Sequence, residues 1–164
     1  MTVVLEEGKT KRVDVSLTPI KEARWVKPTI YNDPQNDWSS YPNWPPEAAY
    51  DGDEQTFAMC NIIYGPNWSG WLELIPTPLL CSKVRYLVMP SNYTSLMQLE
   101  VEWDGVWHPI YEGNPQYDAY IWRERELGGT YLVSALHLRF WRSRADKLAA
   151  ADVYETDFWE VNTY

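Results

Sequence analysis

The stretch Val101–Trp107, with the sequence VEWDGVW, carries the clearest hairpin signal of this 164-residue chain. Asp104-Gly105 lies between two runs in which apolar and polar residues alternate. Asp-Gly is a preferred pair for the two-residue turns that join antiparallel strands, and alternation with a period of two indicates a strand with one buried face. We therefore expect two paired strands, Leu96–Trp103 and Val106–Tyr111.

Similar short runs continue on both sides of this hairpin. They are rich in Val, Leu, Tyr and Trp, and turn residues separate them. Many short strands with frequent turns are typical of a β-sandwich or barrel. The one helical-looking patch, residues 145–151, predicts a turn or a short helix. The expected fold class is an all-β, jelly-roll-like antiparallel β-sandwich with further strands at Phe57–Tyr64, Gly70–Leu74, Lys83–Met89, Ala119–Trp122, Ala135–Trp141 and Val153–Val161.

The first residues form a pattern of their own. Val3–Leu5 and Val13–Leu17 flank a polar turn, which predicts a short hairpin within residues 1–20. This hairpin can be the end of a preceding module, with residues 21–164 forming the sandwich in a larger protein. It can equally belong to the sandwich itself, because hairpin signals are local and say little about neighbours.

Charge and composition exclude several classes of function. The net charge is −9, whereas binding to nucleic acid or to an anionic membrane needs a basic surface. No apolar stretch has the length that crosses a bilayer, so we expect neither nucleic-acid binding nor membrane insertion. No catalytic motif occurs, and we expect a protein that is not an enzyme.

The chain has ten Trp and twelve Tyr against three Phe. Trp and Tyr are favoured where an apolar face must also meet polar groups. The tryptophans within the expected strands are interpreted mostly as core residues: Trp71, Trp103, Trp107, Trp141 and Trp159.

The segment Ala48–Phe57, AAYDGDEQTF, gathers three carboxylates, a glycine and a threonine hydroxyl within residues 51–56. Hard cations such as Ca²⁺ take six to eight oxygen ligands, and Asp51, Asp53 and Thr56 could supply several of them. An Asp-Gly turn capped by its own side chains is the alternative. Both interpretations are open at this point.

The segment Tyr31–Pro46 contains four prolines among Asn, Asp and Ser residues, which predicts a long irregular loop. Long loops without secondary structure are often functional. Sugar rings stack on aromatic faces while amide groups bind their hydroxyls. The candidates for such a site are Trp38, Tyr41, Trp44, Asn36 and Asn43, joined by Trp68 from a later turn. The alternative is that these aromatics fold back over the open end of the sandwich or pack on a neighbouring domain.

The order of three motifs resembles one known family. A D-G-D-x-x-T loop at 51–56, G-W-L-E-L at 70–74 and W-D-G-x-W at 103–107 follow one another as in discoidin, or coagulation-factor (F5/8) type C, domains. That group includes the family 32 carbohydrate-binding modules, and the resemblance runs from about Ala23 to Val161.

The resemblance implies a galactose-binding-like sandwich whose loops bind the ligand at one end. It also implies a structural Ca²⁺ ion beside the D-G-D loop, closed by a glutamate from the last strand. Glu155 is the expected closing ligand. Asp157 or Glu160 would replace it if the register is shifted by two residues, because alternate residues share a face.

The expected function is a non-catalytic carbohydrate-binding module of a larger extracellular or surface protein, with a glycan as partner. The alternative is a structural or assembly module of a surface layer, filament or virion, in which exposed aromatics contact neighbouring domains or copies of the same chain. An accessory domain of a glycoside-active enzyme is a third interpretation. Cys60 and Cys81 could form a disulfide or remain two buried thiols.

Overall fold

The computed structural model describes residues 22–39, 42–62, 66–115, 120–144, 146 and 149–161. The expected N-terminal hairpin and Tyr41 lie outside these residues. The regular secondary structure of the described part is β-strand, apart from one short 3-10 helix, η1 (Pro46–Ala49). Its strands are β1 (Arg24–Val26), β2 (Ile30–Asn32), β3 (Ala58–Ile62), β4 (Asn67–Trp68), β5 (Leu72–Ile75), β6 (Leu79–Pro90), β7 (Thr94–Trp103), β8 (Val106–Gly113), β9 (Arg123–Arg142) and β10 (Ala149–Glu160).

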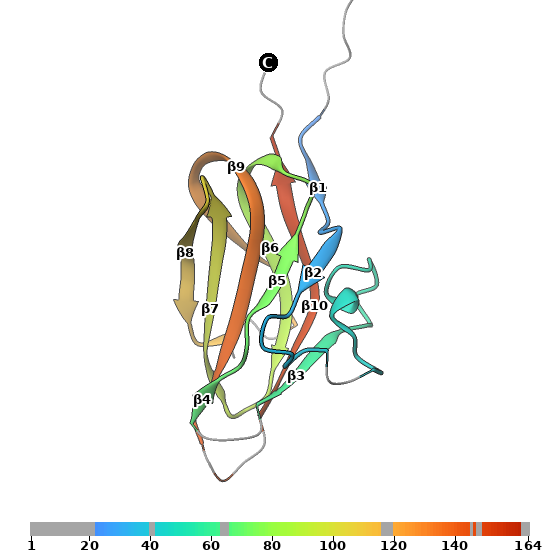
Figure 1. Cartoon of the computed structure of the whole chain (residues 1–164), viewed down its shortest axis with the longest axis vertical. Helices are drawn as coiled ribbons and strands as arrows, with labels where there is room; N and C mark the ends of the chain where they lie inside the picture. Colours follow the sequence, from blue (N-terminus) through green and yellow to red (C-terminus); the bar gives the residue numbers. More distant parts are fainter. Residues whose placement is uncertain are drawn as a thin grey trace, which may run out of the picture.

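The strands form one antiparallel sheet that curls into two layers (Figure 1). In one layer β10 pairs with β6 on one edge and with β1 and β3 on the other. In the second layer β9 pairs with β5 and β7, β5 continues to β2, and β7 continues to β8. The expected all-β sandwich is confirmed.

Strand β9 connects the two layers because it pairs with β6 in its first half and with β5, β4 and β7 in its second. Its course changes at Gly128–Gly129, where Gly128 has φ +79°. Glycine adopts that backbone conformation without the steric penalty that other residues meet. The register between β6 and β9 shifts at this point, between Cys81 and Lys83, and the pairing with β5 and β7 follows from Val133 onward.

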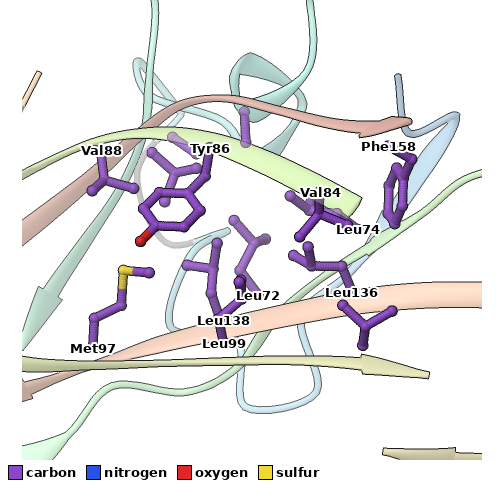
Figure 2. Packing of buried hydrophobic residues seen from close by; sticks show 14 of the residues in the cluster. Leu72, Leu74, Val84, Tyr86, Val88, Met97, Leu99, Leu136, Leu138 and Phe158 are labelled. Carbon is purple, nitrogen blue, oxygen red and sulfur yellow. The ribbon is translucent and has the colours of Figure 1, made fainter. Parts of the chain in front are cut away.

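The core lies between the layers, and the alternation of each strand supplies it. Figure 2 shows aliphatic side chains from β5, β6, β7 and β9 meeting with Tyr86 and Phe158. Leu72, Leu74, Val84, Leu136 and Leu138 have no exposed surface. Burying a side chain of this kind contributes about 1.5–3 kcal/mol relative to exposure.

The hairpin predicted from Asp104-Gly105 is confirmed. Both residues have positive φ, +55° and +72°, as a two-residue type I′ turn requires. β7 and β8 pair on either side, with Trp103 opposite Val106.

Some element predictions are wrong. Tyr120–Trp122 is not a strand, since Tyr120 turns the chain with φ +52°. Residues 149–151 belong to β10 and not to a helical patch. The strand prediction at Ala135–Trp141 missed the first half of β9, and β1, β2 and β4 were missed because they are only two or three residues long.

The irregular loop after β2 is held by side chains. Asp33 accepts the backbone N–H groups of Asp37, Trp38 and Ser39 at 2.8–3.1 Å. Asp37 accepts the N–H of Gly70 at 2.5 Å, where a Cβ would lie 2.8 Å from that of Gln35. The loop therefore approaches Gly70 too closely for any larger residue.

Cys60 and Cys81 are buried free thiols. Desolvation by burial raises the pKa of Cys60 well above its usual range, and that of Cys81 to about 11. Neither thiol therefore ionises near neutral pH.

In the part of the chain that the structure describes, no helix is long and apolar enough to cross a membrane.

Candidate functional site

A cavity of about 330 Å³ lies between the residues before η1 and the loop that follows it. Trp44 and Phe57, whose rings lie 6.2 Å apart with an interplanar angle of 14°, give it an aromatic wall. Phe57 also contacts Tyr154 of β10, at 5.1 Å between ring centroids. The remaining lining residues bring amide, carboxylate and hydroxyl groups: Asn43, Pro45, Glu47, Ala48, Asp51, Gln55 and Thr56. We call this cavity the loop pocket.

The loop at Asp51–Thr56 is shaped by its own polar groups. Asp51 Oδ2 accepts the Thr56 hydroxyl at 2.7 Å, and its Oδ1 accepts the N–H of Asp53 at 2.8 Å. The Thr56 hydroxyl also lies 3.0 Å from the Asp53 carbonyl oxygen, and Asp53 Oδ1 accepts the N–H of Gln55. Gly52 has φ +95°. This is the arrangement of a capped Asp-Gly turn.

Glu155 lies beside this loop, but its carboxylate bonds to Lys27 and to the backbone of Gly52 and not to the side chains of Asp51 or Thr56. Its Oε1 accepts the N–H of Gly52 at 2.5 Å, and its Oε2 accepts a hydrogen bond from Lys27 Nζ, also at 2.5 Å. Glu155 lines a second cavity, of about 220 Å³, with Trp25, Lys27, Glu54, Arg85, Trp122 and Asp157. Burial is the largest influence on Glu155 and raises the pKa of its carboxyl, against the hydrogen bonds from Lys27 and Gly52.

These positions do not fit a calcium ion as the residues lie. The Asp51 carboxylate and the Thr56 hydroxyl bond to each other, and the Glu155 carboxylate binds an ammonium group. Among the described residues, no three His, Cys, Asp or Glu side chains come together as metal ligands. The side chains predicted as calcium ligands are therefore engaged with other partners, and calcium binding is a prediction that only a titration can test.

The predicted ligand-binding residues divide into separate groups. Asn43 and Trp44 line the loop pocket. Trp38 does not: it is 0% exposed, and its indole N–H donates to the carbonyl of Gly70. Its predicted place in a binding surface is wrong, because the ring folds back into the core against Phe140.

Asn36 is exposed, but it is not among the residues that line the pocket. Trp68 lies in β4 against Trp141 of β9, on the other layer.

The prediction that the strand tryptophans are mostly core is also wrong, with Trp103 as the exception at 8% exposure. The ring of His137 stacks between Trp71 and Trp107, with centroid distances of 3.6 and 3.7 Å. The guanidinium of Arg139 lies over Trp71 at 4.2 Å and over Trp68 at 4.5 Å. We call these five side chains, Trp68, Arg139, Trp71, His137 and Trp107, the ring ladder.

The ring ladder lies outside the second layer, because Leu136, Leu138 and Phe140 alternate with its β9 residues and face the core. His137 Nε2 lies 2.7 Å from Glu100 Oε2. Desolvation is the largest influence on His137 and lowers its pKa, although Glu100 opposes it. Arg139 Nε donates to Gln98 at 2.7 Å.

Sequence reasoning missed Glu47, Gln55 and Phe57 in the pocket. Gln55 and Phe57 lie within the Ala48–Phe57 segment and Glu47 directly precedes it, but that segment was considered only for oxygen ligands of a metal ion. Lys27 was missed for another reason: it is 128 residues from Glu155 in the chain, and nothing local marks it.

Comparison with known proteins gives the fold a name. The chain aligns with a CBM32 module of the CpGH89 protein of Clostridium perfringens, in complex with GlcNAc-α-1,4-galactose. The TM-score is 0.60 at 12% identity, over 85% of this chain and 97% of that one. CBM32-1 of a family 31 glycoside hydrolase from the same organism gives a TM-score of 0.59 at 12% identity, covering 82% and 96%.

An F5/8 type C domain from Bacteroides fragilis gives a TM-score of 0.58 at 10% identity, covering 86% and 98%. This chain has the CBM32/discoidin fold. At these identities the likeness describes the fold, and function has to be argued from the site. No protein-family model matches the sequence, and no curated protein matches it either.

Proposed function

We propose that this CBM32/discoidin-fold domain is a non-catalytic carbohydrate-binding module of an extracellular or surface protein. The observation that carries the proposal is the loop pocket, where an aromatic wall meets amide, carboxylate and hydroxyl groups. Small-molecule sites combine apolar surface with a few polar groups in this way. Its volume of about 330 Å³ suits one or two sugar rings, near the lower end of ligand-pocket sizes.

Trp44 and Phe57 would contact the apolar C–H face of the sugar. Asn43 and Gln55 can both donate and accept hydrogen bonds, which suits hydroxyl groups that do the same. The CBM32 module of CpGH89 is described in complex with GlcNAc-α-1,4-galactose, which supports a glycan as the class of ligand.

The charge of the loop pocket favours some sugars over others. Glu47 and Asp51 carry carboxylates, and none of the lining residues described is Lys or Arg. Uronic acids would be repelled there, whereas neutral and amino sugars would not. A chitosan-binding module from Paenibacillus shares the fold, with a TM-score of 0.52 at 13% identity.

A thermal-melting screen against neutral sugars, amino sugars and uronates tests the proposal, because a ligand that binds the folded state raises the melting temperature. We expect a neutral or amino sugar to raise it, and Trp44→Ala to abolish that rise. Trp68→Ala is the matched control, a partly exposed tryptophan of the ring ladder whose loss should leave the rise intact.

An assembly module is the second candidate, and an exposed patch favours it. Met89, Tyr120 and Ile121 are 47%, 52% and 50% exposed, and the N–H of Tyr120 bonds to the carbonyl of Val88 beside Met89. Melting that responds to protein concentration and to none of the sugars would replace the carbohydrate proposal with this one.

A further inference from the structure

Lys27 lies between the Asp51–Thr56 loop and the last strand. Pairing of β1 with β10 places Val26 opposite Phe158, so the next residue, Lys27, reaches the carboxylates of β10. Its ammonium lies 2.5 Å from Glu155 Oε2 and 3.6 Å from Asp157 Oδ1. The second oxygen of Glu155 accepts the N–H of Gly52. One carboxylate therefore joins Lys27 to the loop.

The two carboxylates are buried and need positive charge nearby. The side chains of Glu155 and Asp157 are 1% and 3% exposed, and a buried carboxylate without a partner is strongly destabilising. Arg85 binds Asp157 Oδ2, with Nε at 2.8 Å and Nη2 at 2.6 Å. Lys27 and Arg85 together balance the charges of Glu155 and Asp157.

The loop also lies close to the aliphatic stem of Lys27. A Cβ added at Gly52 would lie 3.6 Å from Lys27 Cε, within van der Waals contact. A divalent ion at Glu155 would have to displace this ammonium, since like charges a few ångströms apart repel. It would also have to break the Asp51–Thr56 hydrogen bond to gain ligands from the loop.

We propose that Lys27 is the domain's built-in cation, which ties the Asp51–Thr56 loop to β10 through Glu155 in place of a calcium ion. Asp51 and Thr56 also line the loop pocket, so the tether holds one wall of that pocket in place. The inference concerns stability and metal dependence, and it does not depend on whether the pocket binds a sugar.

The test measures unfolding of the wild-type chain in excess EDTA and again with added CaCl₂, in the absence of sugar. We expect the same melting temperature in both, and no heat of binding when CaCl₂ is titrated into the protein. A rise in the melting temperature of the wild-type protein on addition of calcium would overturn the inference.

A double-mutant cycle measures the tether itself, with Lys27→Met, Glu155→Gln and the double variant compared by urea unfolding. We expect Lys27→Met to raise the unfolding equilibrium constant at least about tenfold, and the effect to be much smaller when Glu155 is already Gln. If the effects of the two single substitutions were additive in the double variant, Lys27 and Glu155 would not be coupled and the inference would be wrong.

Arg24→Met is the matched control, because Arg24 forms an ion pair with Glu160 across the same two strands at 2.8 Å and its side chain is 60% exposed. It should change the equilibrium constant by only a few-fold, since exposed ion pairs contribute little. The wild-type calcium titration needs no variant, so a variant that fails to fold leaves the test standing.

Discussion

The loop pocket and the ring ladder are both rich in aromatic side chains, yet they use their ring faces differently. In the ring ladder, Trp71 has His137 on one side and contacts Arg139 as well, and His137 lies between two indoles. In the loop pocket, Trp44 and Phe57 border a hollow together with polar groups. An aromatic residue outside the core is therefore a binding candidate only where the fold leaves space against its ring.

The largest expected effect tests whether the ring ladder is structural. His137→Ala removes a ring that is 5% exposed and stacked on both sides, and leaves Glu100 without its partner. We expect a loss of about 2–4 kcal/mol in the free energy of unfolding, measured by urea denaturation. Sugar binding by the folded protein should be unchanged, and a loss of binding without a loss of stability would reverse the roles of the two regions.

A smaller effect is expected from Arg139→Met, which keeps the stem and removes the guanidinium between Trp68 and Trp71. Two cation–π contacts at about 0.5–1 kcal/mol each predict a loss of roughly 1–2 kcal/mol, and loss of the hydrogen bond to Gln98 adds to it. Comparing thermal melts of this variant and the wild type checks it. A change near zero would mean that the ring ladder is held by stacking alone.

On the side of the loop pocket, Glu47→Gln should change selectivity more than stability. Glu47 is exposed, and an interaction with a charged sugar there is worth about 0.5–1 kcal/mol. We expect affinity for an amino sugar to fall by roughly two- to fivefold while affinity for its neutral N-acetyl counterpart stays the same, as measured by calorimetric titration. An equal fall for both sugars would show that the charge of Glu47 plays no part.

The smallest effect concerns pH. Burial lowers the pKa of His137 below its usual value of 6.5, so the folded state binds fewer protons than the unfolded state below that pH. His137 therefore adds stability that is complete above pH 6.5 and is lost as the pH falls through the folded pKa. We expect the melting temperature of His137→Gln to change less than that of the wild type as the pH falls below 6.5. If the two proteins showed the same dependence on pH, this assignment to His137 would be wrong.

The sequence predicted the fold better than the site. Alternation and turn residues identified β6, β7 and β8, since Asp104-Gly105 and the apolar period are local signals. It did not predict β9 as one strand of 20 residues, because its pairing with β6 and then with β5 and β7 joins residues far apart in the chain.

The site was predicted only in part, because burial is a tertiary property. Asn43 and Trp44, which were predicted to bind a ligand, line one pocket, and Asp51 and Thr56, which were predicted as calcium ligands, line it too. Trp38 and Trp68 lie in loop-like stretches of sequence, as Trp44 does. In the structure, however, Trp38 is fully buried and Trp68 belongs to the ring ladder. Lys27, the partner of Glu155, directly follows β1 and lies 128 residues away in the chain. Only the pairing of β1 with β10 brings the two residues together.

The most direct test of this account is nuclear magnetic resonance of the indole N–H groups during titration with the sugar that raises the melting temperature most. The account predicts that the Trp44 signal moves, together with backbone signals from residues 43–57, while those of Trp71 and Trp107 stay in place. Movement of the Trp71 and Trp107 signals with Trp44 unchanged would place the ligand on the ring ladder and contradict it.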